Sequence, residues 1–183
     1  MDFITSDTHF LHANSLNFEG CALRKSLYKN EEEMNEGIIR QWNSQAKPGD
    51  TIFVLGDIAC ATDKKIAHRL PGIIERLNGH IILVRGNHDT YATQKVMADH
   101  GHVVCDYYEY KMNKQLMCMS HYPFAAWNKQ RYGSCQAFGH CHGGFAGVGR
   151  QMDVGFDVWG RLLTVNEVFN LLMAIPVHIT EHW

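Results

Sequence analysis

Acidic, amide and imidazole side chains gather at five points of the chain, each directly after a short apolar run. The clusters are Asp7-x-His9, Gly56-Asp57, Gly86-Asn87-His88-Asp89, His121 and Gly139-His140-x-His142. Carboxylate and amide oxygens mixed with imidazole nitrogens suit borderline transition metals such as Mn, Fe, Zn, Co or Ni. The residue types therefore indicate a metal site that does not depend on thiolate ligands.

Each cluster taken alone has an ordinary structural explanation. The first could be a solvated turn, the second a helix cap, and the third a loop that needs a positive φ at Gly86 or Asn87. The last could be half of a structural zinc site, but no second Cys/His pair at zinc-finger spacing follows it. The ordered set favours a shared site, because all five clusters would otherwise follow separate strands by coincidence.

The apolar runs before the first three clusters are expected to be strands, near residues 3–4, 51–55 and 81–84. Asn30, with Glu33 three positions later, predicts the start of a helix between the first two strands. Thr62 predicts a second helix, which Pro71 should kink or divide. This alternation implies parallel strands joined by right-handed crossovers. Polar residues after such strands meet at one edge of the sheet, where open α/β folds bind ligands.

The second half of the chain predicts further strands and one helix. Residues 107–111 and 116–119 suggest a hairpin around Asn113-Lys114, and residues 136–138 and 153–158 suggest two more strands. Thr164-x-x-Glu167 predicts a last short helix that runs through Leu172. The expected fold class is α/β.

Composition limits the classes of protein to consider. A chain of 183 residues with 45% hydrophobic content is expected to form one domain over residues 1–183. The net charge of -2 makes tight binding of long nucleic acid unexpected. No apolar run approaches the roughly 20 residues that span a bilayer. The six cysteines are scattered, which is typical of reduced thiols, so we expect a soluble protein in the cytoplasm.

In their order, the five clusters resemble the signature of the calcineurin-like metallophosphoesterases. The opening Ser6-Asp7-Thr8-His9-Phe10, the pair Trp42-Asn43 and residues 154–159 are similar to the small stand-alone members found in bacteria and phages. The resemblance reaches nearly from end to end. It implies the fold of that family, an α/β/β/α sandwich in which helices flank two sheets.

The resemblance also implies roles for individual residues. One divalent metal ion would be held by Asp7, His9, Asp57 and His142, and a second by Asp57, Asn87, His121 and His140. Asp57 would bridge the pair, and a metal-bound hydroxide would attack phosphorus. Mn is the metal expected to support activity in vitro. His88 would protonate the leaving oxygen. Asp89 would orient the ring of His88 or would cap the next helix.

The predicted reaction is hydrolysis of a small phosphate ester, with a phosphodiester favoured over a monoester. A metal-dependent nuclease and a non-catalytic scaffold of the same fold are the alternatives. The sequence indicates neither the physiological substrate nor the oligomeric state. Arg24, Asn43, Arg85, Tyr122 and Arg131 are weaker candidates for contacts with substrate. His12 could contact the metal ligands from outside or touch substrate, although a solvated histidine is the simpler expectation.

Overall fold

The computed structural model describes residues 1–18 and 21–178 of the chain. Its first sheet has the strand order β4-β3-β2-β1-β9. These strands are β1 Asp2–Thr5, β2 Thr51–Val54, β3 His80–Val84, β4 Val103–Cys105 and β9 Leu163–Thr164. β1 to β4 pair in parallel, and β9 runs antiparallel to β1. The predicted strand and helix alternation is confirmed here, and β4 is a strand that the sequence did not suggest.

The second sheet has the order β5-β6-β7-β8. Its strands are β5 Tyr108–Met112, β6 Gln115–Met119, β7 Cys135–Phe138 and β8 Gln151–Asp153. β5 and β6 form the predicted antiparallel hairpin, whereas β6, β7 and β8 pair in parallel. Both turn residues, Asn113 and Lys114, have positive φ, as a tight hairpin turn requires.

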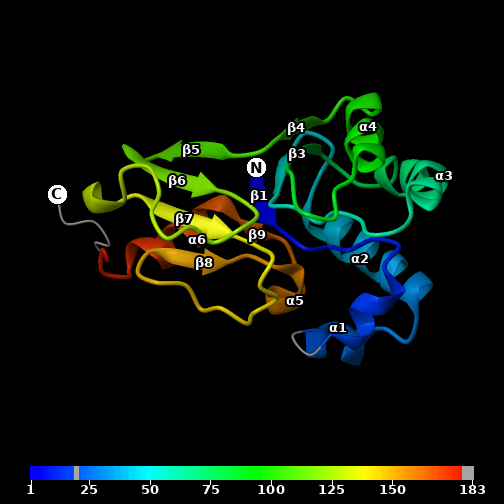
Figure 1. Ribbon diagram of the computed structural model, residues 1–183. Coiled ribbons are helices and arrows are strands. Elements are labelled where there is room, and N and C mark those ends of the chain that lie inside the picture. Colours follow the sequence, from blue (N-terminus) through cyan, green and yellow to red (C-terminus); the bar gives the residue numbers. More distant parts are fainter. Residues whose placement is uncertain (19–20, 179–183) are drawn as a thin grey trace.

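Alternating side chains of β1 and β2 divide the interior into two cores. Phe3 and Ile52 lie in a core shared with three helices, whereas Ile4 and Phe53 lie in a core shared with the second sheet. The helices are α2 Glu31–Gln45, α3 Asp63–Ile74 and α4 Tyr91–Asp99, and Figure 1 shows them on the side of the first sheet away from the second. α6 Val165–Met173 contacts strands of both sheets. The predicted class, two sheets flanked by helices, is confirmed.

Three helix starts follow the capping chemistry expected from sequence. The side chains of Asn30, Thr62 and Thr164 accept backbone hydrogen bonds from Glu33, Lys65 and Glu167 at the starts of α2, α3 and α6. Further helices among the described residues are η1 Ala13–Asn17, α1 Ala22–Leu27, η3 Gln130–Tyr132 and α5 Phe156–Trp159. In the described part of the chain, no helix is long and apolar enough to cross a membrane.

One expectation about local structure is wrong in part, and a second is wrong. α3 is not divided at Pro71, because the proline lies within its last turn and a half, and Leu70 and Ile73 anchor that end in the core. Residues 153–158 are not one strand: the chain turns at Gly155, whose N–H donates to Asp153 Oδ1 at 2.8 Å, and then forms α5. A short buried apolar run does not by itself distinguish a strand from a helical turn.

Candidate metal centre

All seven predicted ligand residues lie just beyond the carboxyl ends of strands. Asp7 and His9 follow β1, Asp57 follows β2, and Asn87 follows β3. The second sheet contributes His121 after β6, and His140 and His142 after β7. Both sheets therefore deliver polar side chains to one region.

Four of these residues surround one point. His9 Nε2 lies 3.8 Å from both Asp7 Oδ1 and Asp57 Oδ2. His142 Nε2 lies 4.0 Å from Asp7 Oδ1. Asp7 Oδ1 and His9 Nε2 are buried, and neither has a hydrogen-bond partner among the described residues. Buried polar atoms without partners are costly, so their position calls for an additional partner.

A second group adjoins the first through Asp57. Its Oδ2 lies 3.5 Å from His121 Nε2, which is itself 2.9 Å from Asn87 Oδ1. Asp57, His121 and His140 each place a potential ligand atom within 4.8 Å of the other two. The same carboxylate oxygen therefore faces both groups of donors.

Each of the donors described next directs one polar atom toward this space, and its other polar atom is held by a neighbouring group. Asp7 Oδ2 accepts from Ser6 Oγ at 2.6 Å and from the His140 N–H at 3.0 Å, which leaves Oδ1 unpaired. Asp57 Oδ1 accepts from the His88 N–H at 2.8 Å, which leaves Oδ2 facing the histidines. In His9, His121 and His142 it is Nδ1 that contacts a neighbouring group and Nε2 that faces the carboxylates.

These residues fit divalent cations. Two atoms bound to one ion at roughly 2.1 Å must lie within roughly 4.2 Å of each other, and the measured separations of 3.5 to 4.0 Å satisfy that limit. Burial raises the pKa of Asp7 to about 8 and lowers that of His9 well below its usual value. Bound cations would supply the positive charge that stabilises the carboxylate form and would accept the neutral imidazole as a ligand.

The backbone at these residues is held in an unusual conformation. Positive φ occurs at five of the seven: Asp7 (53°), His9 (50°), Asp57 (54°), His140 (69°) and His142 (47°). Residues other than glycine rarely adopt a positive φ, and this conformation persists only where the surroundings impose it. Here the Asp7 and His9 N–H groups donate to the carbonyls of Gly56 and Asp57, both at 3.0 Å. These bonds tie the loop after β1 to the loop after β2.

Two glycines leave space for the same side chains. A Cβ at Gly56, whose φ is +90°, would overlap the His121 ring, and a Cβ at Gly86 would overlap the Asp57 carboxylate. Glycine is therefore required at both positions by close approach to the donor groups.

Comparison with known proteins assigns the family. The model of the family described as calcineurin-like phosphoesterase matches residues 3–178. The chain belongs to this family. The resemblance noted in the sequence is thereby confirmed, and metal-dependent hydrolysis of phosphate esters is the chemistry of the family.

The chain is also similar to individual proteins from archaea, bacteria and phages. It is 37% identical over 89 residues to an uncharacterised protein of Methanocaldococcus jannaschii, covering 49% of this chain and 47% of that one. It is 24% identical to the gene 66 protein of Mycobacterium phage L5 over 94% of each chain. A protein of unknown function from Aquifex aeolicus has a similar fold, with a TM-score of 0.68 and 20% identity over 93% of this chain and 98% of that one.

In this phosphoesterase a buried ion pair supports His142. Asp157 Oδ2 lies 2.5 Å from His142 Nδ1, and Asp157 Oδ1 accepts from Arg24 Nε at 2.5 Å. Arg24 is only 2% exposed and also donates to the backbone carbonyls of Asp7 and Thr8 at 2.7 and 2.8 Å. Arg24, a weaker candidate for a contact with substrate, is therefore a buried structural residue. Asp157 was missed because its segment looked like a strand, although the family resemblance covered it.

Interactions with neighbouring groups set the direction of the pKa shifts of His142 and Asp157. Burial alone would lower the pKa of His142, but the hydrogen bond to Asp157 raises it to about 10. Burial likewise opposes ionisation of Asp157, yet His142 and Arg24 hold the pKa of that carboxyl below its usual value. Asp157 is thus an anionic partner that fixes the ring of His142.

Asp89 has neither of the two roles that the sequence suggested, which were to orient the His88 ring or to cap the next helix. Its Oδ2 accepts from the N–H groups of Asp57 and Gly86, both at 2.8 Å, and its Oδ1 accepts from Ile58 N–H at 3.1 Å. Thr90, not Asp89, occupies the N-cap of α4. Burial raises the pKa of Asp89 to about 7. With both oxygens engaged by backbone amides, Asp89 holds the loops after β2 and β3 together and does not orient the His88 ring.

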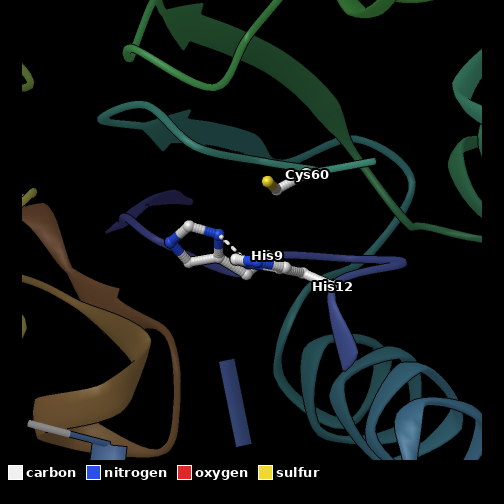
Figure 2. A group of neighbouring side chains, drawn as sticks. All are labelled: His9, His12 and Cys60. Atoms are coloured by element: carbon white, nitrogen blue, oxygen red, sulfur yellow. Dashed lines mark hydrogen bonds between the residues drawn. The ribbon is translucent and has the colours of Figure 1, made fainter. Parts of the chain in front are cut away.

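The His88 ring meets groups that the sequence did not indicate. Its Nδ1 lies 3.3 Å from Cys60 Sγ, and its ring centroid lies 5.6 Å from that of His9 and 5.9 Å from that of His12. His12 is half-buried rather than solvated. Figure 2 shows His12 and Cys60 beside His9.

The other proposed substrate contacts separate into two groups. Asn43 bonds to backbone groups of Arg76 and Asn78, and Arg131 lies over the ring of Tyr132, so both have structural partners. Arg85 and Tyr122, in contrast, line a cavity of about 360 Å³ next to the metal centre. Its remaining walls are formed by Gly86, Asn87, Asp106, Ser120, His121 and Phe124.

Asp157→Asn tests the support of His142. We expect Mn²⁺ binding to weaken about 10- to 100-fold, because His142 loses its anionic partner. The free energy of unfolding should fall by about 3–5 kcal/mol, since the buried Arg24 guanidinium loses its counter-ion. Calorimetric titration of metal-free protein and urea unfolding measure the two effects.

The matched control is Glu167→Gln, which breaks the more exposed ion pair with Arg161. This variant should lower the free energy of unfolding by at most about 1 kcal/mol and leave metal binding unchanged. If Asp157→Asn behaved like this control, the supporting role of Asp157 would be wrong.

Proposed function

We propose that this chain is a dinuclear-metal phosphoesterase that hydrolyses small phosphate esters, with diesters preferred to monoesters. The proposal rests above all on the position of Asp57 Oδ2, which lies 3.8 Å from His9 Nε2 in one donor group and 3.5 Å from His121 Nε2 in the other. One carboxylate oxygen between two groups of donors suits a pair of cations better than a single one.

Asp7, His9, Asp57 and His142 would hold one cation, and Asp57, Asn87, His121 and His140 the other. When bound, such a pair supplies positive charge to the phosphate oxygens and makes a coordinated water acidic enough to act as nucleophile near neutral pH. The protein contributes the fixed positions of these donors. Asp89 supports them by holding the amides of Asp57 and Gly86.

His88 would move a proton to the leaving oxygen. Its backbone N–H is fixed by Asp57 Oδ1 at 2.8 Å, so the residue is tied to the bridging carboxylate although its ring is not among the donors. Its Nδ1 faces Cys60 at 3.3 Å, which leaves Nε2 to carry the proton for the leaving oxygen. An alkoxide leaves poorly without a proton, so such a group is most useful for unactivated esters.

The cavity beside Asn87 and His121 offers a place for the organic part of a substrate. Tyr122 and Phe124 on its wall are 46% and 37% exposed, so their rings are accessible to a ligand in the cavity. Arg85 forms an ion pair of 2.7 Å with Asp106 at the same cavity. A diester carries an organic group on each side of phosphorus, so it can use this cavity while its other group leaves. The small volume and the net charge of -2 argue against a long nucleic acid.

Metal-free protein titrated with Mn²⁺ should bind two equivalents. Asp57→Asn should lose both, because it removes the shared charge, whereas His9→Ala and His121→Ala should each weaken mainly one. Elemental analysis after gel filtration gives the stoichiometry. One stable equivalent that persists in Asp57→Asn would contradict the shared centre.

His88→Ala should retain both metals and lose roughly 10²–10⁴ in kcat for an alkyl ester, because the alkoxide then leaves without a proton. The loss should be smaller for a nitrophenyl ester, whose leaving group needs no proton. Comparing the two substrates in wild type and variant measures the difference. Equal losses would mean that His88 positions the phosphate and does not donate the proton.

The preference for small diesters is tested by kcat/KM for bis-nitrophenyl phosphate, nitrophenyl phosphate, a 2′,3′-cyclic nucleotide and single-stranded oligonucleotides at two salt concentrations. The diesters should be modestly better than the monoester. Oligonucleotides as the best substrates, with rates falling steeply as salt rises, would identify a nuclease instead, because that slope reports many phosphate contacts. No hydrolysis of any ester by the Mn²⁺-loaded protein would favour a scaffold.

A further inference from the structure

Three histidines of the metal centre, His9, His121 and His142, each have a different partner at Nδ1. For His121 it is the Leu55 carbonyl at 2.8 Å, and for His142 it is the Asp157 carboxylate. For His9 it is Nδ1 of another histidine, His12, at 3.1 Å, the contact drawn as a dashed line in Figure 2. A carbonyl and a carboxylate can only accept a hydrogen bond. An imidazole can either donate or accept, so the protonation of the His9 and His12 pair has to be assigned.

The surroundings of His9 decide that assignment. Its Nε2 is buried, has no hydrogen-bond partner among the described residues, and lies 3.8 Å from oxygens of Asp7 and Asp57. A neutral imidazole that offers Nε2 to a cation must carry its proton on Nδ1. His9 Nδ1 therefore donates, and Nδ1 of His12 is the unprotonated acceptor.

The local fold keeps His12 in place for this contact. Its N–H donates to the His9 carbonyl at 3.3 Å, so residues 9–12 form a turn, helped by the positive φ of Leu11. The carbonyl of His12 accepts from the Ser15 N–H at 3.1 Å and from Ser15 Oγ at 2.7 Å. Its ring also packs edge-to-face against Phe18, with the centroids 5.4 Å apart. The acceptor nitrogen is thus fixed relative to His9.

We propose that His12 is a positioning residue for His9. It fixes the tautomer and the ring orientation of this ligand and strengthens Nε2 as a donor to the cation. The inference rests on the proposed metal centre, because it assigns a role to the partner of one of its ligands. Groups that hold ligating histidines in this way typically change metal affinity about 10- to 100-fold.

The same residues suggest a rival assignment. His9, His12 and Cys60 offer two nitrogens and a sulfur within 4.8 Å of one another, a donor set that would suit Zn²⁺. Two contacts argue against it. His12 Nδ1 is already paired with His9, and the Cys60 thiol lies 3.3 Å from His88 Nδ1. His9 would also have to bind two ions through one ring.

The experiment is titration of metal-free protein with Mn²⁺, and separately with Zn²⁺, by calorimetry. The variants are His12→Leu, which removes the acceptor, and His12→Asn, whose side-chain oxygen can accept in place of Nδ1. His12→Leu should weaken one of the two Mn²⁺ sites about 10- to 100-fold and leave the other nearly unchanged. His12→Asn should restore most of the lost affinity. Cys60→Ser, in the same cluster but paired with His88 Nδ1 and not with His9 Nδ1, is the control and should keep both affinities.

A double variant isolates the mechanism. If His12 acts through His9, His12→Leu should cause no further loss in a His9→Ala background. Thermal unfolding of each metal-free variant checks that it folds, and His12→Asn provides the comparison if His12→Leu does not.

The outcomes separate this inference from the metal centre itself. If His9→Ala weakens one site but His12→Leu does not, the role of His12 is wrong and the centre stands. If His9→Ala leaves both Mn²⁺ equivalents intact, the centre is wrong. A third equivalent of Zn²⁺ that is lost in both His12→Leu and Cys60→Ser would make His12 a ligand and overturn the proposal.

Discussion

The arrangement of the site depends on one buried carboxylate, that of Asp57, placed between two groups of donors. Its Oδ1 is fixed by the His88 N–H, and its own N–H is held by Asp89. This leaves Oδ2 a single position, facing both His9 and His121. Gly56 and Gly86 lack side chains because any Cβ there would occupy the space of these groups. The loops after β1, β2 and β3 are thus adapted to the position of one oxygen.

Forming such a centre is energetically unfavourable, and the rest of the fold has to offset this cost. Like-charged carboxylates are buried near each other, and five donor residues have strained backbone. The two hydrophobic cores on either face of the first sheet supply the compensating burial and keep β1 and β2 from moving. Arg24 adds a buried positive charge that joins Asp157 to the carbonyl groups of Asp7 and Thr8. Because both sheets carry donors, a shift of one sheet against the other would separate them.

The family resemblance assigned the individual ligands. The clusters that carry them could be predicted from the sequence itself, because each follows an apolar run and polar residues meet at the ends of strands. The residues that hold the donors could not. Arg24 and Asp157 are separated by 133 positions, and Asp89 and Asp57 by 32, so no local pattern joins them. His12 lay close to His9 in sequence, but spacing alone does not reveal which nitrogen faces which. The helix caps at Asn30 and Thr164 were predictable for the opposite reason, since their partners lie three residues away.

Most of the donors and the exposed aromatic side chains occupy different parts of the fold, although His121 directly precedes Tyr122 in the loop after β6. The donors are attached to the ends of central strands, where the backbone is fixed on both sides by neighbouring strands. The exposed aromatic side chains Tyr122 and Phe124 belong to the loop after β6. This loop does not contribute to either sheet. Phe124 is held through its backbone: its N–H donates to Gln136 Oε1 at 3.0 Å and its carbonyl accepts from Gln151 Nε2 at 2.7 Å, so its backbone is fixed without any contribution from the ring. This separation explains why the motifs identify the reaction while the substrate has to be sought in loops whose sequence carries no comparable pattern.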